Sequence, residues 1–203
     1  MNDAGHSAEF LDTHEPASTA SLLAVVALLV GTALVFVAAT APLQMLIGPH
    51  RGAIAATFHG MAALFDLAVG TVGLYLAWRL WTGRIRAFAD LQLLATAGAT
   101  MSFLAIVFGN WLYIYYRDKE GPRSYFKANM PAIHGIFFEF KEFAALYTLP
   151  LTVIAAFILW YYGARVLDRK WLRYSVALLL ALAFFYLVVA FGLGAAVTKL
   201  RPA

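Results

Sequence analysis

Long hydrophobic runs, separated by short polar connections, make up most of the chain. Three of them, 16–49, 91–116 and 174–198, contain no charged residue, and each exceeds the ~20 residues that cross the core of a bilayer. Two more runs, 53–78 and 132–164, are similarly long and carry a few ionisable groups. The pattern predicts an all-α integral membrane protein, a bundle of five transmembrane helices.

The ends of the expected spans follow from the charged, glycine and proline residues that interrupt these runs. The spans are approximately 21–45, 53–81, 91–116, 132–164 and 173–198, within a transmembrane domain 21–199. An acidic polar tail, 1–20, precedes this domain and a short tail, 200–203, follows it. The connection from Arg117 to Pro131 is expected to be a loop without a helix, because Gly121-Pro122 interrupts helical hydrogen bonding.

The composition supports a membrane protein and excludes several chemistries. Of the 203 residues, 63% are hydrophobic and 13% are charged, whereas soluble domains are roughly half apolar and about a quarter charged. The absence of cysteine from the sequence removes disulfides, thiolate metal sites and covalently attached haem. The basic residues lie in short connections, where they are typical of headgroup anchors, so we expect a lipid bilayer and no nucleic acid as partner.

Charge does not determine the membrane orientation. Each side of the expected bundle carries seven Lys or Arg residues, so the positive-inside rule gives a tie. We expect a multi-pass protein of a prokaryotic cytoplasmic membrane, with its orientation left open.

A short repeat relates the second and fourth expected spans. Residues 58–61 (FHGM) match residues 133–136 (IHGI), and a Phe followed by an ionisable residue comes six positions after each histidine, at Phe65-Asp66 and Phe140-Lys141. The repeat suggests one leading helix followed by two duplicated helical hairpins.

Two histidines are the strongest candidates for chemistry. His59 and His134 lie near the start of their spans, and the ~1.5 Å rise per residue places them within ~5 Å of the same depth. Asp66 and Lys141 follow seven residues later on nearly the same helix faces. Their opposite charges at equal depth predict an ion pair.

The other polar residues of the spans gather at the same end of the bundle, which we call face B and which contains the connections 49–53 and 117–131. They are Asn110 and Tyr113 of the third span and Glu139 and Glu142 of the fourth, with Arg117, Arg123 and Lys127 in the adjacent connection. Burying charges in a bilayer is costly, so Glu139 and Glu142 are expected to face the bundle interior, together with Asp66, Lys141 and the two histidines.

In the first interpretation, His59 and His134 are the axial ligands of one b-type haem, with Arg117, Arg123 and Lys127 near its propionates. Through its paired histidines alone, the pattern resembles small membrane b-type cytochromes. We then expect an electron-transfer subunit of a membrane oxidoreductase complex, working between the quinone pool and a redox partner such as a cytochrome c. A quinone is a second candidate ligand.

Two other interpretations stay open. In one, the histidines and the carboxylates Glu139 and Glu142 bind a non-haem metal or relay protons, although their helical phase opposes one compact ligand shell. In the other, the chain is a non-catalytic accessory subunit of a larger complex, and its polar groups only hold the helices together. In the electron-transfer interpretation, Asp66, Glu139, Lys141 and Glu142 tune the pocket or carry a proton.

Overall fold

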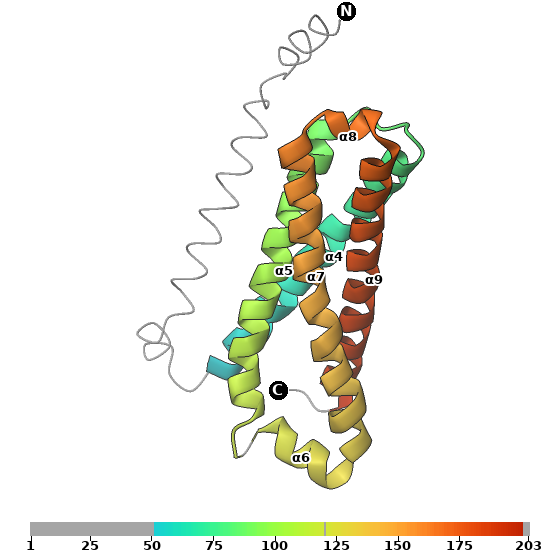
Figure 1. The fold of residues 1–203 in the computed structure, drawn as a ribbon. Coiled ribbons are helices and arrows are strands. Elements are labelled where there is room, and N and C mark those ends of the chain that lie inside the picture. Colours follow the sequence, from blue (N-terminus) through green and yellow to red (C-terminus); the bar gives the residue numbers. More distant parts are fainter. Residues whose placement is uncertain (1–50, 120, 201–203) are drawn as a thin grey trace, which may run out of the picture.

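The computed structural model describes residues 51–119 and 121–200, and within these ranges the chain is helical without any strand. Four helices carry the fold (Figure 1). They are α4 (Arg51–Trp81), α5 (Phe88–Tyr116), α7 (Glu139–Tyr162), which continues from the π-helix η2 (Ile133–Phe138), and α9 (Lys170–Leu200). The expected tail 1–20 and span 21–45 lie outside the described residues, as do residues 201–203.

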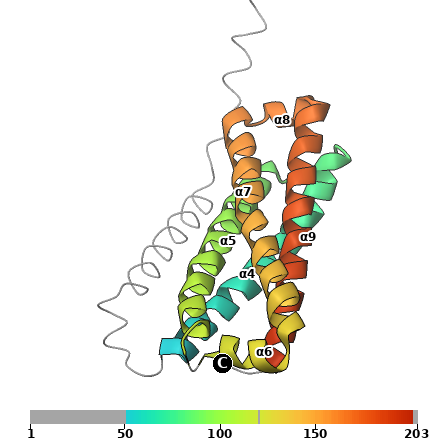
Figure 2. The same cartoon turned by 60° about the horizontal axis from the view of Figure 1, so that its bottom comes forward.

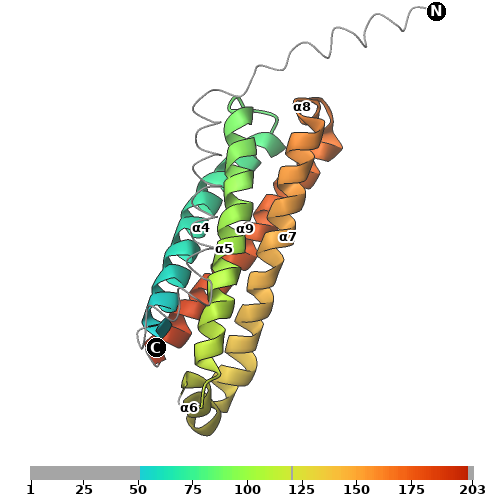
Figure 3. The same ribbon diagram turned by 90° about the vertical axis from the view of Figure 1, so that its left-hand side faces the viewer.

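The four described helices are long and apolar enough to cross a membrane, and their bounds lie within a few residues of the last four expected spans. They form an antiparallel bundle in which α4 packs on α5, α5 on α7, α7 on α9 and α9 on α4. Figures 1 and 3 show this arrangement from two sides. Helices α4 and α7, which carry the two histidines, therefore lie diagonally across the bundle.

A short helix, α6 (Pro122–Asn129), lies at face B (Figure 2), so the prediction of a helix-free connection there was wrong. Pro122 is the first residue of α6, where its missing N–H has no helical partner to lose and its fixed φ suits the helix. Phe126 of α6 is 1% exposed and packs against the ring of Tyr116 at the end of α5. The proline thus begins a helix that covers one end of the bundle.

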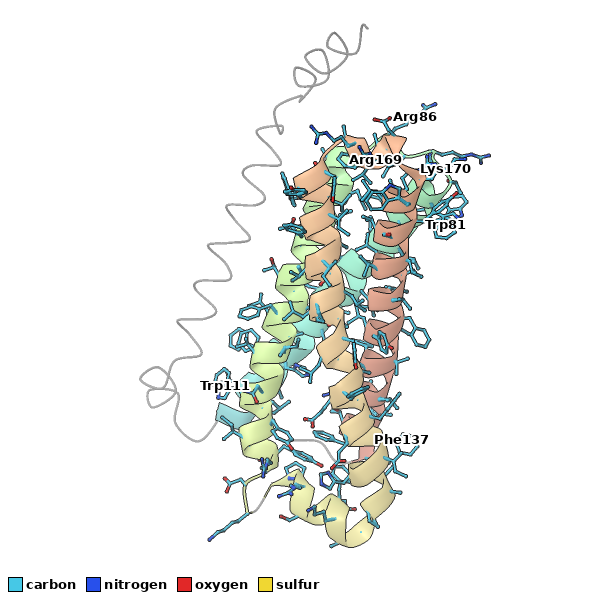
Figure 4. All side chains as sticks on the ribbon, viewed as in Figure 1. Trp81, Arg86, Trp111, Phe137, Arg169 and Lys170 are labelled. Carbon is cyan, nitrogen blue, oxygen red and sulfur yellow. The ribbon has the colours of Figure 1, made fainter. Side chains whose placement is uncertain are left out.

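The opposite end, face A, carries the short helix α8 (Arg165–Asp168) and is typical of a membrane interface. Figure 4 shows Arg86, Arg169 and Lys170 there, with Trp81 close by. Large apolar side chains, among them Leu64 at 57% and Phe157 at 60% exposed, cover the outside of the bundle between the two ends. Such a surface fits a surrounding lipid bilayer.

The inner faces of the helices repeat every seven residues, which is the spacing of near-parallel helix packing. Residues that meet at one depth form a layer, and successive layers are about 10 Å apart because seven residues rise ~1.5 Å each. From face A towards face B the first layer is Gly73, Ala95, Ala155 and Leu180, the second is Asp66, Ser102, Thr148 and Leu187, the third is His59, Gly109, Lys141 and Gly194, and the fourth contains Tyr116 and His134.

The character of the interior changes along this series. The first layer is buried and apolar, and it adjoins the core cluster that includes Leu80, Leu91 and Leu159 near face A. A second apolar cluster, around Phe108, joins α4 and α5. Ionisable side chains occupy only the second, third and fourth layers, so the polar interior extends from face B and ends inside the bundle.

Candidate functional site

The deepest polar layer contains a buried carboxyl group, Asp66, which is 2% exposed on α4. Ser102 of α5, 1% exposed, donates its hydroxyl hydrogen to the Asp66 carboxylate over 2.8 Å. Both residues line a cavity of about 30 Å³ that Thr148 of α7 and Leu187 of α9 also border. The four helices therefore enclose one small space beside a single carboxyl group.

The next layer pairs His59 with a glycine. A Cβ added at Gly109 would lie 3.0 Å from the Cε1 atom of His59, so the imidazole packs directly on the backbone of α5. The His59 Nδ1 atom is 2.9 Å from the carbonyl oxygen of Ala105, which can only accept a hydrogen bond. The proton is thus on Nδ1, and Nε2 keeps a free lone pair.

Lys141 occupies the same layer from the other side of the bundle. Its Cε atom lies 3.4 Å from the position that a Cβ of Gly194 would take, and its ammonium is 5.4 Å from the centre of the Phe138 ring. Two glycines, Gly109 and Gly194, make room for the two basic side chains at this depth.

The layer nearest face B is aromatic. His134, 7% exposed, shares a hydrogen bond of 3.0 Å between its Nδ1 atom and the hydroxyl of Tyr116. The Tyr116 ring stacks on Phe138 with centroids 4.1 Å apart, and Phe138 in turn stacks on Tyr113. His134 and Phe138 both belong to the π-helix η2, a widened turn often found at functional sites.

The structure contradicts the predicted ion pair between Asp66 and Lys141. Among the described residues, Asp66 is hydrogen-bonded to Ser102 and has no ion-pair partner, while Lys141 lies one layer nearer face B, over Phe138. Counting from the expected helix starts puts both groups at equal depth, but α4 begins at Arg51 and the α7 segment only at Ile133. The packing register sets the two residues one layer apart.

The two histidines differ in depth for the same reason. His59 packs on Ala105 and Gly109 of α5, whereas His134 bonds Tyr116, seven residues and about 10 Å further along that helix. The Nδ1 hydrogen bond of His59 is the kind that orients a metal-ligating imidazole. The described residues nevertheless present no clear haem-binding pair of histidines, since His59 and His134 lie in different layers.

This offset also bears on the predicted repeat. Two helical hairpins, α4–α5 and α7–α9, are present as expected. The equivalent residues His59 and His134, however, lie in different layers, so the hairpins do not superpose about an axis along the bundle at this register.

The remaining predicted residues lie around the aromatic layer with varied exposure. Arg117 is exposed and packs its guanidinium 5.5 Å from the centre of the Tyr113 ring. Arg123 is half-buried in α6, and its Nε atom is buried without a hydrogen-bond partner among the described residues. Of the others, Glu142 is half-buried, whereas Asn110, Lys127 and Glu139 are exposed. The expectation that Glu139 faces the bundle interior was therefore wrong: it begins α7 near face B, where its carboxylate lies outside the bundle.

Two hydroxyl residues of the site, Ser102 and Thr148, were missed by the sequence analysis. Their signal is present: Ser102 precedes Gly109 by seven residues, and Thr148 follows Lys141 by seven. Serine and threonine are frequent in membrane helices, so the spacing becomes informative only once the layers are known.

Within the described residues, no group of three or more His, Asp or Glu side chains is placed to hold a metal ion. Comparison with protein-family models, with curated proteins and with solved structures gives no match. Any function for this chain therefore has to be argued from the three polar layers themselves.

Proposed function

We propose that this chain is a multi-pass membrane protein that takes up protons from face B and delivers them to Asp66. The observation that carries the proposal is the order of the layers. Groups that can exchange protons occupy three successive layers from face B, and the next layer inward, Gly73, Ala95, Ala155 and Leu180, is apolar. Such an interior admits protons from one side and stops them at a carboxyl group.

Each polar layer supplies an acid or a base. His134 and Tyr116 lie at the entrance, His59 and Lys141 in the middle, and Asp66 at the end. Histidine exchanges protons near neutral pH, and ionisable groups inside membranes commonly serve as relays. Neighbouring layers are about 10 Å apart, so transfer between them uses the reach of the side chains and intervening water molecules.

A proton path that ends inside the bundle is expected of a protein that loads protons for a partner, whereas a channel needs a path that continues to the other face. We infer that the chain serves within a larger membrane complex, and an oxidoreductase that consumes or releases protons with a quinone or a cytochrome c is the partner class that the sequence favours. The same proposal includes a fifth span at 21–45 and a prokaryotic cytoplasmic membrane. Its lipid-facing helices and short connections support work inside the bilayer.

Infrared spectroscopy of the protein in lipid nanodiscs tests the proposal. An acid-minus-alkaline difference spectrum should contain the band of a protonated carboxyl group, and Asp66→Asn should remove it. The matched control is Glu139→Gln, which alters an exposed carboxyl group and should leave that band in place. A spectrum that is unchanged by Asp66→Asn would refute the proposal.

The direction of uptake needs a second measurement. In oriented vesicles, a pH step applied at face B should change the Asp66 band quickly, whereas a step at face A should act only after the vesicle interior equilibrates. Lys141→Met should slow the response to the face-B step, because it removes a proton-exchanging group from the middle layer. Equal rates from both faces would show that the path is not one-sided.

Haem-based electron transfer is a second candidate, and one observation favours it. The Nε2 atom of His59 has a free lone pair, and its Nδ1 atom is already oriented by Ala105. A reduced-minus-oxidised spectrum of the purified protein decides the matter, because a low-spin b haem gives a sharp absorption band in the visible. Absence of that band from protein purified from cells that make haem would refute haem-based electron transfer.

A further inference from the structure

The cavity beside Asp66 is lined mostly by apolar side chains, with one carboxyl group and three hydroxyl groups among them. Its hydroxyl groups belong to Ser102, Thr148 and Thr152, and each has a single hydrogen to donate. Ser102 gives its hydrogen to Asp66, over 2.8 Å. Thr148 gives its hydrogen to the carbonyl of Ala145, over 2.7 Å, and Thr152 bonds backbone carbonyls of its own helix.

Among the polar groups of the lining, only oxygen lone pairs therefore remain free to bind a ligand. An ionised Asp66 carboxylate accepts hydrogen bonds and donates none, and the hydroxyl oxygens of Ser102 and Thr148 are left in the same position. The methyl carbon of Thr152 lies 3.8 Å from where a Cβ of Gly98 would be, so this residue contributes packing. A guest at this site must bring positive charge or hydrogen-bond donors.

Size and charge narrow the choice of guest. The space of about 30 Å³ is two to three times the ~10–15 Å³ that one water molecule needs, so it admits a small ion together with one or two water molecules. A single carboxylate neutralises one positive charge, and a divalent ion would leave an unpaired charge among apolar side chains such as Leu180 and Leu187.

We infer that the cavity formed by Asp66, Ser102 and Thr148 binds one monovalent alkali cation in competition with a proton. The inference rests on the proposed function, since it adds a second guest to the carboxyl group at which proton uptake ends. One or two water molecules complete the oxygen shell of the ion. The cation reaches the site from face B, because the polar layers of the described bundle lie on that side of the cavity and the layer towards face A is apolar.

The charged groups around the site set how strongly a cation is held. The ionisable residue of α4 that lies one layer nearer face B is His59, and the corresponding residue of α7 is Lys141. In this layer the adjacent helices α5 and α9 present only Ser102 and Leu187. A charged Lys141 repels an alkali ion, so Lys141→Met should strengthen its binding.

Labelling with dicyclohexylcarbodiimide tests the inference, because this apolar reagent adds to protonated carboxyl groups that are shielded from water. The labelled residue is identified by mass spectrometry of the intact chain and of its peptides, with Asp66→Asn as the unlabelled reference. Sodium or potassium chloride should slow the labelling of Asp66, whereas choline chloride at equal ionic strength should not. Competition lowers the rate by the factor 1 + [cation]/Kd, about elevenfold at ten times the dissociation constant.

Two threonine variants make the test specific. Thr148→Val removes an oxygen from the cavity and should weaken protection by the cation, measured as the ratio of the labelling rates in choline chloride and in sodium or potassium chloride. Thr71→Val is the matched control, because the Thr71 hydroxyl also donates to its own helix, over 2.7 Å to the carbonyl of Leu67, but lies on the exposed side of α4. It should behave as the wild type.

The outcomes separate the two proposals. Labelling of Asp66 that neither sodium nor potassium slows would overturn the cation site and leave proton uptake intact. Equal protection in the Thr148→Val and Thr71→Val variants would also count against the cavity. A wild-type protein in which Asp66 is not labelled at any pH would contradict the proposed proton uptake, and the cation site with it.

Discussion

Gly109 is the position where one added carbon atom should disturb the candidate site most directly. A Cβ there would lie 3.0 Å from Cε1 and 3.2 Å from Nδ1 of His59, closer than side chains normally approach. The ring cannot retreat while its Nδ1 atom keeps the 2.9 Å hydrogen bond to Ala105. Gly109→Ala should therefore push His59 out of its place and break that bond.

The expected cost follows from three contributions. Overpacking a tight contact destabilises by about 1–3 kcal/mol, and losing the hydrogen bond costs about 0.5–1.5 kcal/mol more. Alanine is favoured over glycine in a helix by about 1 kcal/mol, which offsets part of this. We expect Gly109→Ala to lower the free energy of unfolding by about 0.5–3.5 kcal/mol.

The assay is reversible unfolding in bicelles or mixed micelles, with Gly60→Ala as the matched control. A Cβ at Gly60 meets no atom within 4 Å, so that variant should be neutral or slightly stabilising. In a His59→Ala background the clash is absent, and Gly109→Ala should become neutral or stabilising too. A Gly109→Ala variant that stays destabilised by the same amount without the imidazole would refute the proposed contact.

Three further variants probe hydrogen bonds between the helices. Tyr116→Phe keeps the aromatic stack but loses the hydroxyl bonded to His134, and should lower the free energy of unfolding by about 0.5–1.5 kcal/mol. Ser102→Ala removes the donor to Asp66 and should cost about 1.5–3 kcal/mol when that carboxyl is ionised. Gln92→Leu loses a 3.0 Å bond to a backbone carbonyl of α7, and should cost about 0.6 kcal/mol, as for other interhelical bonds in membranes.

Each variant has its own check. Tyr113→Phe is the control for Tyr116, because the described structure gives the Tyr113 hydroxyl no hydrogen-bond partner, and an equal loss in both would argue against the bond to His134. The cost of Ser102→Ala should shrink in an Asp66→Leu background, and a constant cost would contradict a direct interaction. A Gln92→Leu protein more stable than the wild type would show that burial outweighs this bond.

How far the sequence predicts the site can be seen at His59 and Asp66. Their seven-residue spacing puts them on one face of a helix, and the cost of ionisable groups in lipid turns that face inward. Both expectations hold in the structure, where Asp66 is buried at 2% exposure. Their partners could not be predicted in the same way, because Ser102 and Ala105 belong to another helix.

The connection at 121–122 shows a different limit. Gly-Pro normally interrupts a helix, so the sequence predicts a connection without any helix between Arg117 and Pro131. Proline is equally suited to the first position of a helix. Whether it ends one helix or begins another depends on what the following residues can pack against. Here Phe126 finds a site against Tyr116 under the bundle, and α6 forms.

Hydrophobicity and helical period are local properties of the chain, so they predict the four described helices to within a few residues and the inward placement of His59 and Asp66. The depth at which one helix meets another depends instead on how the helices pack. Helix packing fixes that register through contacts such as His59 on Gly109 and Lys141 on Gly194, which involve residues distant in sequence. A shift of one layer, about 10 Å, parts Asp66 from Lys141 and His59 from His134, and leaves a one-sided polar interior in place of the expected paired site.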